Sequence, residues 1–211
     1  MEKSEVAAAP RSLKEKQRRE REALILQAAE EVLTEKGYYE TSIDEIAARV
    51  GIAKGTVYLH FPSKEDLVVA IFMRDIQQLI EKVCEISALE QSASEKMRAI
   101  LHCIYGKVYA KRMRLLFRMT NNVESLHHWK ERGQKLFGVW EKLAQLISDV
   151  LEQGRASGEF SSEIPTSVML STFFCLLSPR SYERLVLEEE MDANALVGYL
   201  ERLYFKGITR N

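Results

Sequence analysis

Residues that interrupt regular structure are scarce in this chain, which has 10 glycines and 4 prolines among 211 residues. Because turns depend on these two residue types, their scarcity favours long helices over many short strands. Apolar residues recur at helical spacing along most of the chain. Ser42 precedes Glu45 by three residues and Ser92 precedes Glu95 likewise, the pattern of a capping box. The sequence therefore predicts an all-α protein of about nine to ten helices.

The ends of the predicted helices are marked by caps and breakers. Gly37 and Gly51 follow apolar helical stripes and are expected to end the first two helices in a left-handed conformation. Ser63 and Asp66 open the fourth helix after Pro62. The predicted helices cover residues 18–36, 42–50, 54–60, 64–86, 92–112, 113–120, 124–153, 166–177, 180–189 and 192–207.

Charge and cysteine content exclude several classes of protein. Thirty Lys and Arg residues balance 31 Asp and Glu residues, so the net charge is −1 and any binding of nucleic acid must come from a local patch. Three cysteines without a CxxC pair argue against a disulfide framework and a zinc site. The longest apolar run, 168–177, is shorter than the roughly 20 residues that cross a membrane. We expect a cytoplasmic protein that binds no membrane.

The most informative segment is 43–61, IDEIAARVGIAKGTVYLHF. Ala47, Gly51 and Val57 have the spacing of a helix-turn-helix. Small Ala47 lets two helices cross closely, and Gly51 tolerates the positive φ of a sharp turn. The second helix of such a pair fits the major groove of DNA, which is about 12 Å wide. This spacing predicts DNA binding.

The residues expected to contact DNA lie on the second helix and at the starts of two others. Lys54 and Thr56 are placed to reach base edges or phosphates, while Gly55 allows close approach of the backbone. Helix starts supply free N–H groups that bind phosphate. The full set of predicted DNA-binding residues is Thr41, Ser42, Lys54, Gly55, Thr56, Tyr58, His60 and Lys64.

Residues 21–71 resemble the DNA-binding domain of the TetR family of bacterial transcriptional repressors. The resemblance rests on several fixed spacings at once. One departure is Ala53, where the family often has a serine that caps the recognition helix; its loss removes a cap worth about 1 kcal/mol. The matching residues are Ala28-Ala29, Gly37-Tyr38, Thr41-Ser42, Ile46-Ala47, Gly51-Ile52, Gly55-Thr56-Val57-Tyr58, His60-Phe61 and Ser63-Lys64-Glu65 with Leu67.

This resemblance implies three parts. Residues 1–20 are expected to form a flexible basic arm, since Arg11 to Arg21 holds six positive and two negative residues. That arm is either a solvated tail or one that touches an anionic polymer. Residues 21–66 form the helix-turn-helix domain, and residues 67–211 form a helical domain for effector binding and dimerisation.

The resemblance also implies a homodimer, paired through its last two long helices, that reads a pseudo-palindromic operator. A small effector in the C-terminal domain is expected to release the DNA, with the fourth helix as the lever. The apolar lining favours a hydrophobic or aromatic effector, while basic residues between 107 and 118 favour an anionic one such as an acyl thioester. The predicted effector-binding residues are Phe72, Ile76, Tyr105, Tyr109, Phe117, Trp129, Phe137, Trp140 and Phe173.

Two other functions remain open from the sequence: a DNA-binding protein of the same fold that organises the chromosome without an effector, and an enzyme that uses the C-terminal cavity. His102-Cys103 and His127-His128 lack a partner at metal-binding spacing, and no nucleophile or phosphate-loop motif occurs. We therefore expect no catalytic residue, no metal and no cofactor. The direction of control, repression or activation, also stays open.

Overall fold

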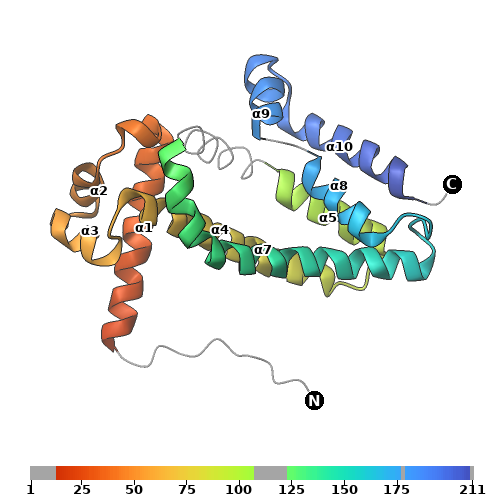
Figure 1. The fold of residues 1–211 in the computed structure, drawn as a ribbon, viewed down its shortest axis with the longest axis horizontal. Coiled ribbons are helices and arrows are strands. Elements are labelled where there is room, and N and C mark those ends of the chain that lie inside the picture. The colour runs from red at the N-terminus through yellow and green to blue at the C-terminus, as the bar shows by residue number, and fades with distance from the viewer. Residues whose placement is uncertain (1–12, 107–122, 177–178, 210–211) are drawn as a thin grey trace. The chain divides into compact units, whose positions relative to one another are not determined.

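The structure is a computed structural model that describes residues 13–106, 123–176 and 179–209; for 123–137, 179–180, 183 and 187 it describes the backbone alone. Figure 1 shows that the described chain is helical. Its elements are α1 (Leu13–Glu40), α2 (Ile43–Val50), α3 (Lys54–His60), α4 (Lys64–Ser87), α5 (Ala93–Tyr105), α7 (Val123–Ser157), α8 (Thr166–Cys175), α9 (Pro179–Tyr182), a π-helical turn (Glu183–Glu188) and α10 (Ala193–Ile208). The described ranges contain no strand, only an isolated bridge between Phe160 and Thr209. The all-α prediction is confirmed.

Local signals set the helix ends near residue 50. Ser42 caps α2, because its hydroxyl oxygen accepts a hydrogen bond from the N–H of Glu45 at 3.2 Å. Gly51 ends α2 in the left-handed region, with φ 73° and ψ 34°. Gly37 has a φ of 80° and interrupts α1, so a kink separates the last turn of α1 from the rest of the helix. The predicted end at Gly51 is confirmed, whereas Gly37 has a positive φ but kinks α1 and does not end it, since the helix continues to Glu40.

The chain divides into two compact units, the first ending at Phe72 and the second beginning at Met73. In the first unit α1 packs against α2 and α2 against α3. Its core is apolar and includes the first two turns of α4. The fully enclosed side chains are Ile25, Ala29, Val32, Ile46, Val57, Leu67 and Val68.

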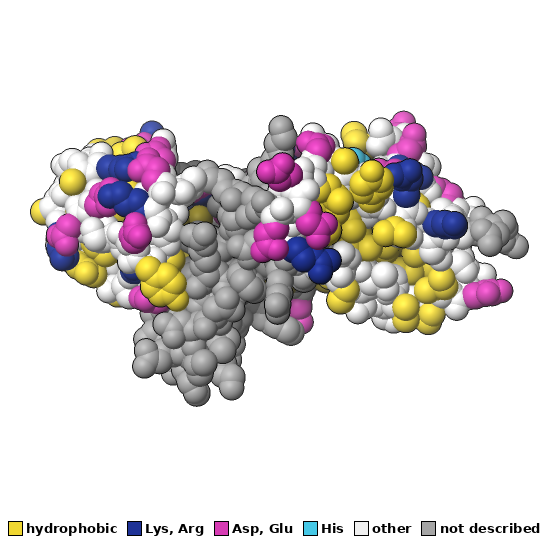
Figure 2. All heavy atoms as spheres, turned by 90° about the horizontal axis from the view of Figure 1, so that it is seen from above, with side chains coloured by type: hydrophobic (Ala, Val, Ile, Leu, Met, Phe, Trp, Pro, Cys, Tyr) yellow, Lys and Arg dark blue, Asp and Glu magenta, His cyan; other side chains and the backbone are white. Residues whose placement is uncertain are grey.

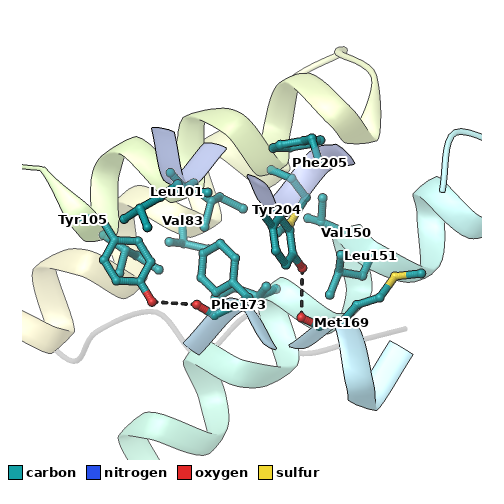
Figure 3. Packing of buried hydrophobic residues seen from close by; sticks show 14 of the residues in the cluster. Val83, Leu101, Tyr105, Val150, Leu151, Met169, Phe173, Tyr204 and Phe205 are labelled. Carbon is teal, nitrogen blue, oxygen red and sulfur yellow. Dashed lines mark hydrogen bonds between the residues drawn. The ribbon is translucent and has the colours of Figure 1, made fainter. Parts of the chain in front are cut away.

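The second unit is built around α8, which is tied to two neighbouring helices (Figure 3). The hydroxyl of Tyr105 on α5 donates to the carbonyl oxygen of Phe173 at 2.6 Å, and that of Tyr204 on α10 donates to Met169 O at 3.0 Å. The ring of Phe173 lies between these two tyrosines, with centroid distances of 5.9 and 5.5 Å. The buried hydroxyls are thus paired, which removes the cost of leaving a polar group unsatisfied in an apolar core.

Several helix boundaries differ from the prediction. Helix α5 ends at Tyr105, seven residues before the predicted end, because the backbone is extended at Gly106. Helix α1 begins at Leu13, five residues before the predicted start, because the charged residues there pair one turn apart, as Glu15 does with Arg19. Helix α7 continues to Ser157, through Gly154, which the sequence suggested as a loop residue. No described helix combines the length and the hydropathy needed to span a bilayer.

Gly154 is required by packing. A Cβ atom at this position would overlap the ring of Phe160 and lie 3.0 Å from the Cβ of Ala93. The Phe160 side chain is only 1% exposed, so it has no room to retreat. A glycine inside a helix is therefore explained by the aromatic ring that crosses it.

We predict that Gly154→Ala lowers the free energy of unfolding by about 1–3 kcal/mol, the usual cost of overpacking. The matched control is Gly138→Ala in the same helix, where an added Cβ meets no atom within 4 Å. That control should gain up to about 1 kcal/mol from helix propensity. Urea unfolding of both variants measures the difference, and equal stability would contradict the packing explanation.

Candidate DNA interface

Helices α2 and α3 form the crossed pair that the sequence predicts. Ala47 is 3% exposed and Val57 is fully buried, so a small residue and an apolar wedge occupy the crossing. The N–H groups of Gly51 and Ile52 donate to Ala48 O at 3.2 Å and Ala47 O at 3.0 Å. Nothing lies within 4 Å of a Cβ built on Gly51, so its positive φ is what calls for glycine there.

The outer face of α3 is open. Lys54, Gly55 and Tyr58 are exposed, and Thr56 is half-buried. A Cβ added to Gly55 would meet no atom within 4 Å. Leu59, which was not singled out in the sequence, is 80% exposed on the same short helix. As predicted, no side chain caps α3 at Ala53.

Lys54 at the start of α3 is paired with an acid on α2. Its ammonium nitrogen lies 2.6 Å from Oδ2 of Asp44. This hydrogen bond raises the pKa of Lys54, which keeps the side chain charged. Sequence reasoning missed Asp44; the only local signal was its place in the first turn of α2.

Lys64 and Thr41, both predicted to meet phosphate, make contacts within the chain. The ammonium of Lys64 donates to Tyr38 O at 2.8 Å and to Thr41 O at 3.1 Å, and it lies 4.2 Å from the centre of the Tyr38 ring. Partial burial lowers the pKa of Lys64. The Thr41 hydroxyl donates to Gly37 O at 2.6 Å, and the residue is 3% exposed. The two bonds from Lys64 attach the segment just before Ser42 to the first turn of α4.

Another bond joins the same segment to α4. The Tyr38 hydroxyl donates to Oε1 of Glu65. Burial and then this carboxylate raise the pKa of Tyr38. Burial alone would raise the pKa of Glu65, but the hydrogen bonds to its carboxylate, first among them the one from Tyr38, and the charge of Lys64 together lower the pKa. Tyr38, Lys64 and Glu65, here called the loop clamp, are placed by packing that the sequence did not disclose.

His60 ends α3 and faces α1. Its Nδ1 lies 3.1 Å from Oε1 of Glu22, and its side chain is 8% exposed. Burial would raise the pKa of Glu22, but the hydrogen bonds from His60 and Arg18 lower it. Nδ1 of His60, which the sequence predicts near a phosphate, is thus bonded to Glu22 on α1. This contact holds the end of α3 against α1.

The predicted effector-binding residues are only partly covered by the structure. Phe72, Ile76, Tyr105 and Phe173 are buried, and the last three belong to one apolar cluster in the second unit. Trp140 is 38% exposed and meets Phe174 edge to face at 6.0 Å. Tyr109 and Phe117, and the side chains of Trp129 and Phe137, lie outside the described residues.

The histidines also have specific surroundings. His102 on α5 lies 2.7 Å from a carboxylate oxygen of Glu201 on α10, and Arg98 pairs with the same acid. His127 and His128 have no described side chains. Among the side chains that are described, no three His, Cys, Asp or Glu residues gather as a metal site would require.

Comparison with known proteins identifies the domain that contains this interface. The family model described as bacterial regulatory proteins, tetR family, matches residues 25–71, which include all of α2 and α3. The fatty acid metabolism regulator protein of Bacillus subtilis (strain 168) is 25% identical over 193 residues, covering 92% of this chain and 98% of that protein.

Two solved structures share the fold. The fatty acid degradation regulator FadR from Bacillus halodurans has a TM-score of 0.69 at 23% identity, covering 88% of this chain and 94% of that one. The transcriptional regulator FadR from Bacillus subtilis, solved with stearoyl-CoA, has a TM-score of 0.66 at 24% identity. The match covers 88% of this chain and 98% of that one. Residues 25–71, which hold the helix-turn-helix, thus match the tetR family of bacterial regulatory proteins, and the chain as a whole is similar in fold to these two regulators.

Proposed function

We propose that this chain is a cytoplasmic, homodimeric repressor that binds a pseudo-palindromic operator and leaves it when a long-chain acyl thioester binds its second unit. The observation that carries the effector class is the match, along 92% of the chain, to a regulator of fatty acid metabolism. The alternative of an enzyme is not favoured, because these relatives are regulators.

The open face of α3 supports the DNA-binding part of the proposal. Lys54 and Thr56 offer donors for base edges or phosphates, and Gly55 leaves room for the duplex to come close. One helix of seven residues reads few base pairs. Two copies about 34–36 Å apart would read two half-sites of a palindrome, which calls for a dimer.

Exposed apolar residues of the second unit support dimerisation. Leu203 on α10 is 69% exposed, Tyr199 47%, and Val168 on α8 50%. Figure 2 shows hydrophobic side chains gathered on one face of this unit. Phe173, Leu196, Leu200 and Tyr204 are buried within the chain, so the proposed dimer uses the outer faces of the last helices. Contiguous exposed apolar surface is typical of a protein interface.

The interior of the second unit suits an apolar guest. The buried hydroxyls of Tyr105 and Tyr204 already donate to carbonyl oxygens, and aromatic rings surround Phe173. Each methylene of an acyl chain gains about 0.8 kcal/mol when it leaves water, so a long chain outweighs a short one. The basic residues predicted to favour an anionic group, at 107–118, lie outside the described residues. In the related Bacillus subtilis structure the ligand is stearoyl-CoA.

Helix α4 supports a route from effector to DNA. Its first turn holds the loop clamp residues Lys64 and Glu65, and its later residues Ile80 and Val83 are buried in the core of the second unit. An effector changes DNA affinity only if it binds two conformations unequally. We propose that the guest displaces the far end of α4 and thereby strains the loop clamp.

The Lys54–Asp44 pair gives a first test, because its two partners should act in opposite directions. We predict that Lys54→Ala weakens operator binding roughly tenfold or more, the range for one lost base or phosphate contact. Asp44→Asn removes a carboxylate that repels phosphate, so it should tighten binding to random duplexes and steepen the salt dependence. Fluorescence anisotropy on operator and random DNA measures both.

Glu81→Gln on α4 makes the same change of charge away from α3 and serves as the control. If Asp44→Asn behaves like this control on both duplexes, Asp44 does not govern Lys54. If the unaltered protein ignores every duplex from its own promoter region at low salt, the proposed function itself fails.

Gly55 gives a second test, in which stability and binding should separate. We predict that Gly55→Ala keeps or raises the free energy of unfolding, by up to about 1 kcal/mol, because alanine favours helix. The same methyl group should weaken operator binding, because it occupies space the duplex needs. Gly138→Ala on α7, also without a neighbour within 4 Å, should gain stability and keep DNA affinity. Unchanged operator affinity in Gly55→Ala would show that DNA does not approach this face.

Acyl chain length gives a third test. We predict that hexadecanoyl-, tetradecanoyl- and dodecanoyl-CoA release the operator at rising concentrations. Each step of two methylenes is worth about 1.6 kcal/mol, or roughly 15-fold in affinity. Free coenzyme A should leave the complex intact. Release by free coenzyme A, or equal potency at every chain length, would rule out burial of the acyl chain; no release by any of them would favour an effector-independent DNA-binding protein.

A further inference from the structure

The first turns of α1 extend beyond the core of the first unit. The side chains buried on α1 begin at Ile25, whereas the helix begins at Leu13. In Figure 1 this part of α1 runs on past α3 toward the N-terminus. Between residues 13 and 21 there are five basic and two acidic residues, in a chain whose net charge is −1. A helical segment that buries no apolar face must be stabilised by other interactions.

The positive charge lies on one side of this extension. Lys14, Arg18 and Arg21 are spaced by four and three residues, and the same spacing leads on to Ile25 and then Ala28. Residues at this spacing share one face of a helix. Ile25 and Ala28 are buried against the rest of the first unit. The three basic residues, here called the basic row, therefore continue the inward face of α1 past the point where apolar residues end.

The acidic residues of this part of α1 form ion pairs, and only one of these pairs involves a residue of the basic row. Glu15 pairs with Arg19 at 2.9 Å, and Lys16 lies 4.0 Å from Glu20. Arg18 in the row lies 3.0 Å from Glu22, which also accepts from His60. Within the described residues Lys14 and Arg21 form no ion pair. The row thus keeps two cations, Lys14 and Arg21, that pair with no acid in the part of the chain that the structure describes.

The basic row begins beside the recognition helix. The 3.1 Å contact between Glu22 and His60 places the end of α3 against α1 just where the row starts. At 1.5 Å per residue, Lys14 lies about 12 Å further along the axis than Glu22. That reach is comparable with the width of the major groove, about 12 Å, so a duplex bound by α3 has backbone phosphates within range.

We propose that the basic row is a second DNA-binding element, which grips the phosphate backbone bordering the groove that α3 enters. The proposal rests on the proposed function, because it needs α3 on DNA. Its occupant is duplex DNA, since a row of three basic residues, two of them without an ion pair among the described residues, complements phosphates and starts where the end of α3 contacts α1. The contacts carry no sequence information; they add affinity and salt dependence.

The test compares two double variants that remove the same charge from opposite faces of one helix. Lys14→Gln/Arg21→Gln removes the two cations that pair with no described acid, and Lys16→Gln/Arg19→Gln removes two that pair with acids. We expect the first to weaken operator binding roughly tenfold or more near 0.1 M salt. It should lower the slope of log K against log salt by about 2 per protomer, since each phosphate contact contributes about 0.9. Lys16→Gln/Arg19→Gln should change the operator affinity and the salt slope much less.

Ethylation interference then locates the contacts on the operator. Phosphates whose ethylation weakens the unaltered protein should stop mattering for Lys14→Gln/Arg21→Gln and keep mattering for Lys16→Gln/Arg19→Gln. Circular dichroism and thermal unfolding confirm that both variants stay folded. Equal losses in the two variants, or an unchanged pattern of phosphates, would overturn the proposal while leaving the proposed function intact. Failure of the unaltered protein to bind any duplex would instead refute the proposed function.

Discussion

The ammonium group of Lys64 holds together the part of the first unit that presents α2. It bonds to the carbonyl oxygens of Tyr38, in the last turn of α1, and of Thr41, just after that turn, and it lies over the ring of Tyr38. A lysine ammonium that loses water needs hydrogen-bond acceptors close by, and here the backbone carbonyls of Tyr38 and Thr41 supply them. Those carbonyls end α1 and precede Ser42, so one side chain fixes how three helices meet. The ammonium group that the sequence predicts on a DNA phosphate thus stabilises, within the chain, the surface that we propose binds DNA.

Local chemistry made much of this fold predictable. Ser42 and Ser92 cap helices through bonds to residues three positions on, and Gly51 takes a backbone conformation that other residues avoid. Each of these effects acts within one turn, so the order of residues is enough to foresee it. The extra turns of α1 were missed because their stability comes from charge pairs one turn apart, which carry no apolar period.

Effects that depend on distant residues could not be foreseen. Lys64 and Tyr38 are 26 positions apart, and His60 and Glu22 are 38 apart, so no spacing rule links them. Asp44 and Lys54 meet only because the turn at Gly51 folds α3 back against α2. Gly154 looked like a breaker because the ring of Phe160 that excludes a side chain is visible only in three dimensions. The sequence therefore predicts a DNA-binding face but does not disclose which of its polar groups bond within the chain.

Helix α4 is one unbroken element from Lys64 to Ser87, and it contributes side chains to both cores. Neither core is complete without a stretch of this helix. A fragment cut at the boundary after Phe72 would expose a fresh helix end with four unsatisfied carbonyls, where the intact chain has a continuous ladder. The two halves of the molecule are therefore not modules that evolution or an engineer can exchange at that boundary; a working graft has to carry the shared helix whole.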